Sequence, residues 1–195
     1  AHLLVANSHT TLLLFSSKGK VYWLKTYEIP EASRAARGRP LVNLLPLDDG
    51  EYITTMLPVE EYTEGHFIFM ATANGTVKKT PLEAFSRQRS VGLIALELDE
   101  GDVLISAAIT DGEREVMLFS DGGKVTRFKE SDVRAMGRTA RGVRGMRLPE
   151  GQKLISMLIP EEGSQILTAS ARGYGKRTAI SEFPEYKRGG QGVIA

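Results

Sequence analysis

One pattern recurs four times along this chain of 195 residues. Each copy has an apolar segment, a tight glycine turn, a second segment that carries lysine or arginine, and a basic loop that contains glycine. The turn glycines are Gly19, Gly75, Gly123 and Gly173, at intervals of 56, 48 and 50 residues. A repeat of about 50 residues that is built from strands predicts a propeller-like array of small sheets.

The apolar segment and the return segment of each copy predict a β-hairpin. The apolar segments are short, rich in β-branched and aromatic residues, and end at a turn signal, as buried strands do. They are 12–15, 67–71, 116–119 and 166–169, and the return segments are 20–23, 76–79, 124–127 and 174–177. Acidic turns at 47–50, 98–101 and 148–151 each precede another apolar segment. One repeat therefore carries about four strands, which is the content of a propeller blade.

We therefore expect an all-β, propeller-like fold of four-stranded blades in a single domain over residues 1–195. The approximate repeats are 1–50, 51–101, 102–151 and 152–195, of which the last is incomplete. Both ends of the chain fall within a repeat, so we also expect the chain to be a piece of a longer protein. In three repeats the loop glycine follows the turn glycine by 19 residues, which implies structured chain of fixed length between them.

The charges are nearly balanced in number but unevenly distributed. The chain has 25 Lys and Arg residues against 24 Asp and Glu residues, for a formal net charge of +1. Acidic residues gather in turns, whereas basic residues gather in the long loops and the return segments. Residues 134–147 alone include five arginines and no carboxylate. If the equivalent loops share one edge of the array, that edge is positive and the other edges are acidic.

Arginine and lysine next to glycine are suited to phosphate contact. Glycine lets the backbone approach closely, its exposed N–H groups donate to phosphate oxygens, and a guanidinium group makes forked hydrogen bonds. Such contacts hold a duplex without reading its sequence. The residues that we expect to bind DNA are Arg34, Arg37, Arg39, Lys78, Lys79, Arg87, Arg89, Arg127, Arg138, Arg141, Arg144, Arg172, Lys176, Arg177, Lys187 and Arg188. Alternate residues of a strand face opposite sides, so one member of each adjacent basic pair should face solvent, and the sequence leaves open which one.

No motif in the sequence predicts catalysis or a cofactor. The histidines His2, His9 and His66 lack the spacing of metal ligands, so we expect no metal site. The glycine-containing loops lack the spacing of a nucleotide-binding loop. No run approaches the roughly 18 apolar residues that a membrane span needs. The absence of cysteine fits a reducing compartment.

Several segments of the chain resemble a known family. They are 36–46 (ARGRPLVNLLP), 70–80 (MATANGTVKKT), 127–137 (RFKESDVRAMG), 142–145 (GVRG) and 173–179 (GYGKRTA). Through these segments the chain resembles, over essentially its whole length, the C-terminal domain of the bacterial DNA gyrase A subunit. The segments are more specific to gyrase than to its paralogue, the topoisomerase IV A subunit.

The resemblance implies a fold and a function. The fold is a β-pinwheel, a propeller-like disc whose blades exchange strands with their neighbours, and the chain would hold about four of its roughly six blades. The implied function is sequence-tolerant binding and wrapping of double-stranded DNA around a basic rim. This wrapping supports ATP-dependent negative supercoiling by the whole type IIA topoisomerase.

The resemblance also implies partners and a location. The partners are the gyrase B subunit and the rest of the A subunit, in an A2B2 heterotetramer, and the location is cytoplasmic and associated with the nucleoid. The breakage-reunion tyrosine, ATP and Mg²⁺ act elsewhere in the whole enzyme. We therefore expect this chain alone to be a monomer that binds DNA without catalysis, without a cofactor and without a membrane.

Gyrase carries a signature loop, QRRGGKG, and this chain contains one near relative of it. The relative consists of Tyr186, Lys187, Arg188, Gly189, Gly190, Gln191 and Gly192. It departs from the signature at Tyr186, where the family has Gln, and at Gln191, where the family has Lys. We expect the signature loop itself to precede Ala1, which leaves open whether this chain completes a wrap.

Other functions stay open from the sequence. The chain could be the corresponding domain of topoisomerase IV. It could also be a propeller-like scaffold for protein partners, as the near-neutral net charge and the acidic turns would suit. For a third function, an enzyme that acts on a small molecule, the sequence offers no supporting group of catalytic residues. DNA binding that weakens steeply with salt would favour the wrapping module over the scaffold.

Overall fold

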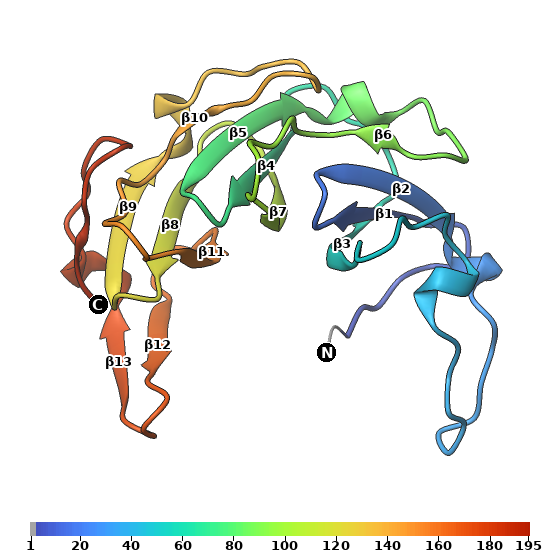
Figure 1. Cartoon of the computed structure of the whole chain (residues 1–195), viewed down its shortest axis with the longest axis horizontal. Helices are drawn as coiled ribbons and strands as arrows, with labels where there is room; N and C mark the ends of the chain where they lie inside the picture. Colours follow the sequence, from blue (N-terminus) through green and yellow to red (C-terminus); the bar gives the residue numbers. More distant parts are fainter. Residues whose placement is uncertain (1–2) are drawn as a thin grey trace.

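Strands dominate the fold. The computed structural model describes residues 3–195, so His2 lies outside the described residues, and residues 3–195 form strands, short 3-10 helices and loops without an α-helix. The strands make three four-stranded antiparallel sheets and one two-stranded hairpin, which confirms the all-β prediction. Figure 1 shows the sheets following one another along an open arc. No helix among the described residues is long and apolar enough to cross a membrane.

The first sheet joins three strands of the first repeat to one short strand of the second. The strands are β1 (Thr11–Ser16), β2 (Lys20–Lys25), β3 (Ile53–Val59) and β6 (Leu93–Ile94), in the order β3-β1-β2-β6. β1 and β2 close into a hairpin because Gly19 in the turn takes a φ of +76°, which side-chain-bearing residues rarely adopt. The predicted hairpin over these residues is confirmed.

The next two sheets repeat this arrangement. The second sheet, in the order β10-β5-β4-β7, consists of β4 (Phe67–Thr72), β5 (Thr76–Pro81), β7 (Leu104–Thr110) and β10 (Val143–Arg144). The third sheet, in the order β11-β8-β9-β14, consists of β8 (Glu115–Ser120), β9 (Lys124–Lys129), β11 (Leu154–Leu158) and β14 (Val193–Ile194). The last hairpin consists of β12 (Gln165–Ala169) and β13 (Gly175–Ala179). In each four-stranded sheet the short outer strand comes from the following repeat, so the blades exchange strands as a β-pinwheel does.

Short 3-10 helices follow the return strands. They are η1 (Thr26–Glu28), η3 (Leu82–Phe85), η4 (Glu130–Asp132) and η5 (Ile180–Glu182), while η2 (Leu41–Asn43) lies farther along the first long loop. Each helix that directly follows a return strand turns the chain away from its own sheet and into the long loop. These helices therefore define where each loop begins.

The sheets divide the chain differently from the repeat boundaries expected after residues 50, 101 and 151. β3, β7 and β11 lie just after those boundaries, yet each pairs with the first strand of the preceding hairpin. Each acidic turn therefore returns the chain to its own blade. Figure 1 shows β3, β7 and β11 on the inner side of the arc and β6 and β10 on its outer side.

Apolar cores lie between successive sheets. Leu13 of the first sheet and Met70 of the second belong to one cluster, and Phe69 of the second and Leu118 of the third belong to the next. β4 of the second sheet is therefore covered on both faces, which explains why residues 67–71 form a continuous apolar run rather than an alternating one. This packing fixes consecutive blades, and hence their outer loops, relative to one another.

Candidate nucleic-acid interface

Four long loops carry most of the residues that we predicted to bind DNA. We call them rim loops 1 to 4; they span residues 26–46, 82–98, 130–148 and 180–195. β6, β10 and β14 are short segments of rim loops 2, 3 and 4, so each of these loops supplies the outer strand of the preceding blade and pairs with its return strand, β2, β5 or β9. Figure 1 shows rim loops 2 and 3 on the outer side of the arc. The equivalent basic loops therefore share one edge of the molecule.

One backbone contact anchors rim loops 2, 3 and 4 in the same way. The carbonyl of a hairpin-turn glycine accepts an N–H group of the loop, in the pairs Gly19–Ala95, Gly75–Gly145 and Gly123–Ala195, at 2.8, 2.8 and 2.9 Å. The loop glycines also approach the preceding strand closely. A Cβ atom on Gly142 would lie 2.5 Å from the carbonyl oxygen of Val77, and one on Gly192 would lie 2.5 Å from that of Val125. The regular spacing in the sequence thus reflects a close contact between backbones.

Rim loop 1 is not anchored in this way. No strand pairs with it among residues 3–195, and every residue from 27 to 40 is exposed. Between residues 30 and 39 its only backbone hydrogen bond within the described chain joins the Ala36 N–H to the Ser33 carbonyl at 3.0 Å. Arg34, Arg37 and Arg39 are therefore exposed on a loop that makes few contacts.

Ten of the predicted residues are exposed and form no ion pair within residues 3–195. They are Arg34, Arg37, Arg39, Arg87, Arg89, Arg144, Arg172, Lys176, Arg177 and Lys187. Arg172, Lys176 and Arg177 lie in the last hairpin rather than on a rim loop. The prediction omitted Arg134 and Arg147, which are also exposed on rim loop 3. Both could have been predicted from the sequence, because they lie in the same carboxylate-free stretch, 134–147, as the other arginines of that loop.

Lys78 is a correction to the predicted set, because its side chain is fully buried. The Nζ atom donates to the carbonyl oxygens of Ala95 at 2.7 Å, Arg138 at 2.6 Å and Ala140 at 3.1 Å. Burial lowers the pKa of Lys78 to about 8, and the nearby positive charge of Arg138 contributes to this lowering. The ammonium group therefore joins rim loops 2 and 3 from below and does not reach solvent.

Lys79 is buried as well, so the expectation that one member of this pair faces solvent is wrong. Its Nζ atom donates to the Glu130 carbonyl at 3.3 Å and lies 4.8 Å from the centre of the Phe67 ring. Both faces of β5 are covered, since one packs in the core and the other lies under rim loop 3. Simple alternation along the strand therefore does not expose either lysine.

Arg127 is a third correction, because it contacts protein rather than solvent. Its guanidinium group forms a two-point ion pair with Glu115, at 2.8 and 2.9 Å, and donates to the carbonyls of Ile180 at 3.1 Å and Phe183 at 2.8 Å. The ion pair lowers the pKa of the Glu115 carboxyl and raises that of Arg127. Arg127 thus holds the last hairpin against the third blade.

One position of the return strand serves the same purpose in three blades. It supplies a side-chain N–H group to a carbonyl of the 3-10 helix that follows the return strand of the next hairpin, in the pairs Trp23–Phe85, Lys79–Glu130 and Arg127–Ile180. The residue types differ, so no sequence motif shows this role. Basic residues at this position belong to the contacts between blades.

Arg138 and Arg141 are partly engaged in contacts between loops. Arg141 is exposed and pairs with Glu97 at 3.4 Å and Asp99 at 3.1 Å on the neighbouring loop. Such exposed pairs contribute little to stability. Arg138 is half-buried, and its carbonyl accepts a hydrogen bond from the Lys78 ammonium beneath the loop.

The segment that resembles the gyrase signature is docked onto rim loop 3. Arg188 donates from Nε to the Asp132 carbonyl at 3.0 Å and from a terminal nitrogen to the Arg144 carbonyl at 3.1 Å. Two backbone hydrogen bonds join the same loops, Gly189 to Gly145 at 2.7 Å and Arg147 to Gly190 at 2.8 Å. Rim loops 3 and 4 therefore form one continuous surface. Tyr186, Lys187 and Gln191 are exposed on it.

A comparison with family models decides the family. The model of the DNA gyrase C-terminal domain, a β-propeller, matches this chain at residues 10–60, 66–111, 114–161 and 164–195. The chain belongs to this family. The resemblance noted in the sequence is confirmed, and each matched segment contains one of the hairpins described above.

Several relatives of this gyrase-family chain are DNA gyrase A subunits. The DNA gyrase A subunit of Pseudomonas aeruginosa is 63% identical over 100% of the chain and 26% of its own length. That of Escherichia coli is 58% identical over 99% of the chain and 22% of its own length. The chain thus spans about a quarter of the length of these curated relatives.

Solved structures support the same fold. The C-terminal domain of DNA topoisomerase IV is similar with a TM-score of 0.87 and 32% identity, covering 96% of this chain and 59% of that one. The C-terminal domain of DNA gyrase A has a TM-score of 0.80 and 31% identity, covering 96% of this chain and 60% of that one. The fold of this chain is thus similar to both domains. The identity of 58% and 63% to gyrase A subunits, against 32% to the topoisomerase IV domain, favours gyrase over topoisomerase IV.

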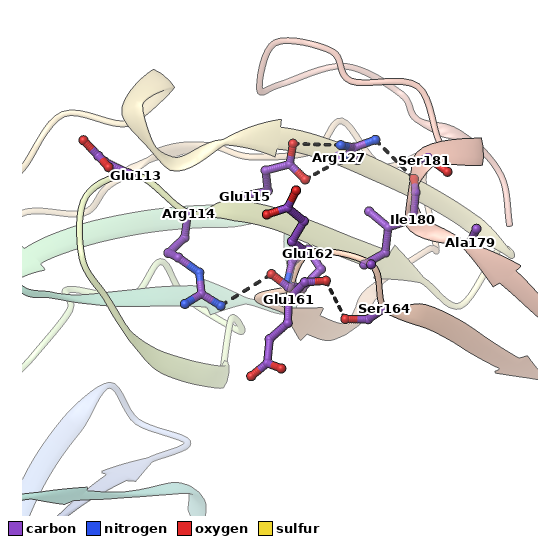
Figure 2. Close-up of a pocket in the computed structure, with 12 residues that line it drawn as sticks. Glu113, Arg114, Glu115, Arg127, Glu161, Glu162, Ser164, Ala179, Ile180 and Ser181 are labelled. Carbon is purple, nitrogen blue, oxygen red and sulfur yellow. Dashed lines mark hydrogen bonds and ion pairs between the residues drawn. The ribbon is translucent and has the colours of Figure 1, made fainter.

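A cavity of about 770 Å³ lies elsewhere in this gyrase-family domain, between the third blade and the last hairpin. Figure 2 shows Glu113, Glu115, Glu161 and Glu162 around it, with Arg127 held by Glu115. Its acidic lining repels phosphate, which separates it from the candidate DNA surface. Within residues 3–195 no three His, Cys, Asp or Glu residues are grouped so that they could hold a metal ion.

The acidic turns are structural parts of the blades. The Glu51 carboxylate is buried and accepts hydrogen bonds from the Tyr22 hydroxyl at 2.8 Å and the Asp48 N–H at 2.9 Å. Asp102 in the second blade accepts the Asn74 N–H at 3.0 Å. Glu51 and Asp102, which directly follow two of the acidic turns, are thus engaged within the fold, whereas Asp48, Asp49, Asp99 and Glu100 of the turns themselves are exposed.

Proposed function

We propose that this chain binds double-stranded DNA along its outer edge without reading the sequence, as the wrapping module of a bacterial gyrase A subunit. The observation that carries the proposal is the joined surface of rim loops 3 and 4. It presents Arg134, Arg144, Arg147 and Lys187, all exposed and without an ion pair among the described residues. Basic side chains at this density attract the phosphate backbone whatever the base sequence.

The curvature of the molecule suits wrapping. The rim loops follow the outer side of the arc (Figure 1), so a duplex that contacts several of them in turn must bend. Contacts to phosphate are sufficient to hold bent DNA, because they compensate the cost of deformation without any contact to the bases.

The wider assignment concerns the whole enzyme. As part of a gyrase A subunit, the chain would act with the rest of that polypeptide and with the gyrase B subunit in an A2B2 assembly, in the cytoplasm on the nucleoid. Wrapping would then support ATP-dependent negative supercoiling. ATP and Mg²⁺ would act elsewhere in that assembly, and we assign the chain itself no cofactor and no catalytic step, with a monomeric state when isolated.

The salt dependence of binding tests the proposal first. Affinity of the 195-residue chain for short duplexes of different base composition should be measured by fluorescence anisotropy at rising salt. We expect similar affinities for all sequences and a loss of roughly a thousandfold between low and physiological salt, because several phosphate contacts release counterions. Salt-independent binding, or no duplex binding at all, would contradict the proposal.

Charge reversal tests the surface. Arg144→Glu combined with Arg147→Glu should weaken duplex binding roughly a hundredfold, since two charge-assisted contacts are lost. Lys18→Glu, which reverses one charge instead of two, is the control, because Lys18 is exposed at a hairpin turn and its Nζ atom already lies 3.9 Å from the Asp48 carboxylate. Equal losses in the control and the double variant would show that general charge, and not the surface of rim loops 3 and 4, determines binding.

A topology assay separates wrapping from simple contact. The chain is bound to relaxed circular DNA, the circle is treated with a nicking-closing enzyme, and the linking number is read. A shift supports chiral wrapping. Binding without a shift limits the function to DNA contact, and a tight protein partner without DNA binding would favour a scaffold.

A further inference from the structure

Rim loop 3 contains a turn whose peptide groups are oriented by a buried charge. The Lys78 Nζ atom, which is fully enclosed, lies 2.6 Å from the Arg138 carbonyl oxygen and 3.1 Å from that of Ala140. Both carbonyl groups therefore point inward, toward the strand beneath the loop.

The N–H groups of the same peptide units point outward. In a trans peptide unit the C=O and the following N–H lie on opposite sides, and residues 3–195 contain no cis peptide bond. The N–H groups of Thr139 and Arg141 are therefore turned away from Lys78. Neither donates a hydrogen bond within the described chain, and both residues are exposed.

Two neighbouring N–H donors above a positive charge form the kind of site that binds an anion. The buried Lys78 charge is poorly screened by solvent, and its pKa of about 8 keeps it protonated at neutral pH. The Arg141 guanidinium is turned toward Glu97 and Asp99, so the backbone of Arg141, and not its side chain, is available at this point.

We propose that residues 138–141 of rim loop 3 form a phosphate site, in which the main-chain N–H groups of Thr139 and Arg141 bind one phosphodiester group of DNA above the buried Lys78 ammonium. The inference rests on the proposed DNA binding. It adds a main-chain contact, independent of the exposed arginines, that fixes where the backbone of the duplex crosses this loop.

Rim loop 4 lacks this arrangement and serves as an internal control. Thr126 stands there at the strand position of Lys78, and Gly189 stands at the loop position of Thr139. The Gly189 N–H already donates to the Gly145 carbonyl at 2.7 Å, so it is not available to a ligand. The proposed site is therefore not repeated on rim loop 4.

The test follows backbone amide signals by nuclear magnetic resonance. The nitrogen-15-labelled 195-residue chain is titrated at neutral pH with inorganic phosphate and, separately, with a short blunt-ended duplex. We expect the Thr139 and Arg141 amides to shift in both titrations and the Gly189 amide to keep its hydrogen-bonded shift with phosphate. Shifts elsewhere on the rim without shifts at Thr139 and Arg141 would overturn the proposed phosphate site but not the proposed DNA binding. The absence of any shift with duplex would overturn the proposed function.

Lys78→Met gives an independent measurement. Loss of the buried charge should weaken duplex binding about tenfold and lower the salt slope by about one, because one phosphate contact is lost. The Thr139 and Arg141 responses should disappear while the response of Lys187 on rim loop 4 to the duplex persists. Arg141→Gln, which keeps the N–H group, should retain them. Persistence of both amide responses in Lys78→Met would contradict the role of the buried ammonium, and if this variant does not fold the titration of the unmodified chain decides.

Discussion

Rim loops 3 and 4 occupy equivalent places on consecutive blades, but different side chains hold them. Under rim loop 3 the donor is Lys78 on β5, which reaches carbonyls of the loop from below. At the same position under rim loop 4 stands Thr126, whose buried hydroxyl has no hydrogen-bond partner among residues 3–195. The donor there is Arg188 in the loop itself, which binds two carbonyls of rim loop 3.

This difference changes what each loop can offer to DNA. A cation on the strand beneath the loop draws carbonyls inward and leaves backbone N–H groups at the surface. A cation within the loop uses its own N–H groups on protein carbonyls and is partly withdrawn from the surface. Two loops that both combine basic residues with glycine therefore present different donors to DNA.

The largest effect should come from the feature that the two loops share. Gly142→Ala and Gly192→Ala should each lower the free energy of unfolding by about 3 kcal/mol, from the positive φ and from the collision of the new Cβ with a carbonyl oxygen. Gly38→Ala is the control, since its φ is also positive but no atom lies within 4 Å of the new Cβ, and it should cost only about 1 kcal/mol. Denaturant unfolding measures all three. Tolerance of one loop variant but not the other would break the equivalence of the loops.

The next effect concerns the donor under rim loop 3. Lys78→Met should lower the free energy of unfolding by about 2 kcal/mol, because buried carbonyls of rim loops 2 and 3 lose their hydrogen-bond donor. Urea denaturation of the variant beside the unmodified chain measures this. Unchanged stability would show that the cost of burying the charge equals the gain from its hydrogen bonds.

The same lysine should make stability depend on pH. Its pKa is about 8 in the folded chain and has the higher ordinary lysine value in the unfolded chain, so the unfolded chain binds more protons between these values. Raising the pH from 8 to 9 should therefore stabilise the unmodified chain relative to Lys78→Met by about 1 kcal/mol. Thermal unfolding of both chains across this range measures the difference. A difference that stays constant with pH would contradict the lowered pKa.

The smallest effect is expected at the corresponding position of the next blade. Thr126→Val removes a buried hydroxyl that has no hydrogen-bond partner within the described residues, with little change in volume. The free energy of unfolding should rise by about 0.5 kcal/mol, opposite in sign to the effect of Lys78→Met. A clear loss of stability in urea would show that Thr126 has a partner, and the contrast between the two junctions would then be weaker.

Much of the fold could be predicted because its signals are local. A run such as 67–71 followed by Asn74 and Gly75 indicates a hairpin without knowledge of the rest of the chain. The exchanged strands could not be found in this way. β6, β10 and β14 have two residues each, so they carry no periodic pattern, and only the family resemblance implied the exchange. The blade to which β3 belongs could not be found from the sequence for a related reason, since pairing of β3 with β1 is a tertiary contact.

The candidate site was predicted in part. Charge distribution along the chain located the basic loops, and their common edge followed from the repeat. The exposure of individual residues could not be predicted from the sequence. Lys176 and Arg177 are exposed, whereas Lys78, Lys79 and Arg127 are not, although all five are basic residues on return strands. The difference lies in whether a neighbouring loop covers the strand.

The sequence by itself determined the four hairpins and the basic character of the loops between them, since turn glycines and apolar runs act over a few residues. The tertiary structure decided which basic groups face solvent. The three carbonyls around Lys78 come from residues 17, 60 and 62 positions away, and only the packing of consecutive blades brings them to one ammonium group. A charged group can be buried where such acceptors replace its hydrogen bonds to water. No local sequence pattern shows that these distant acceptors lie next to Lys78.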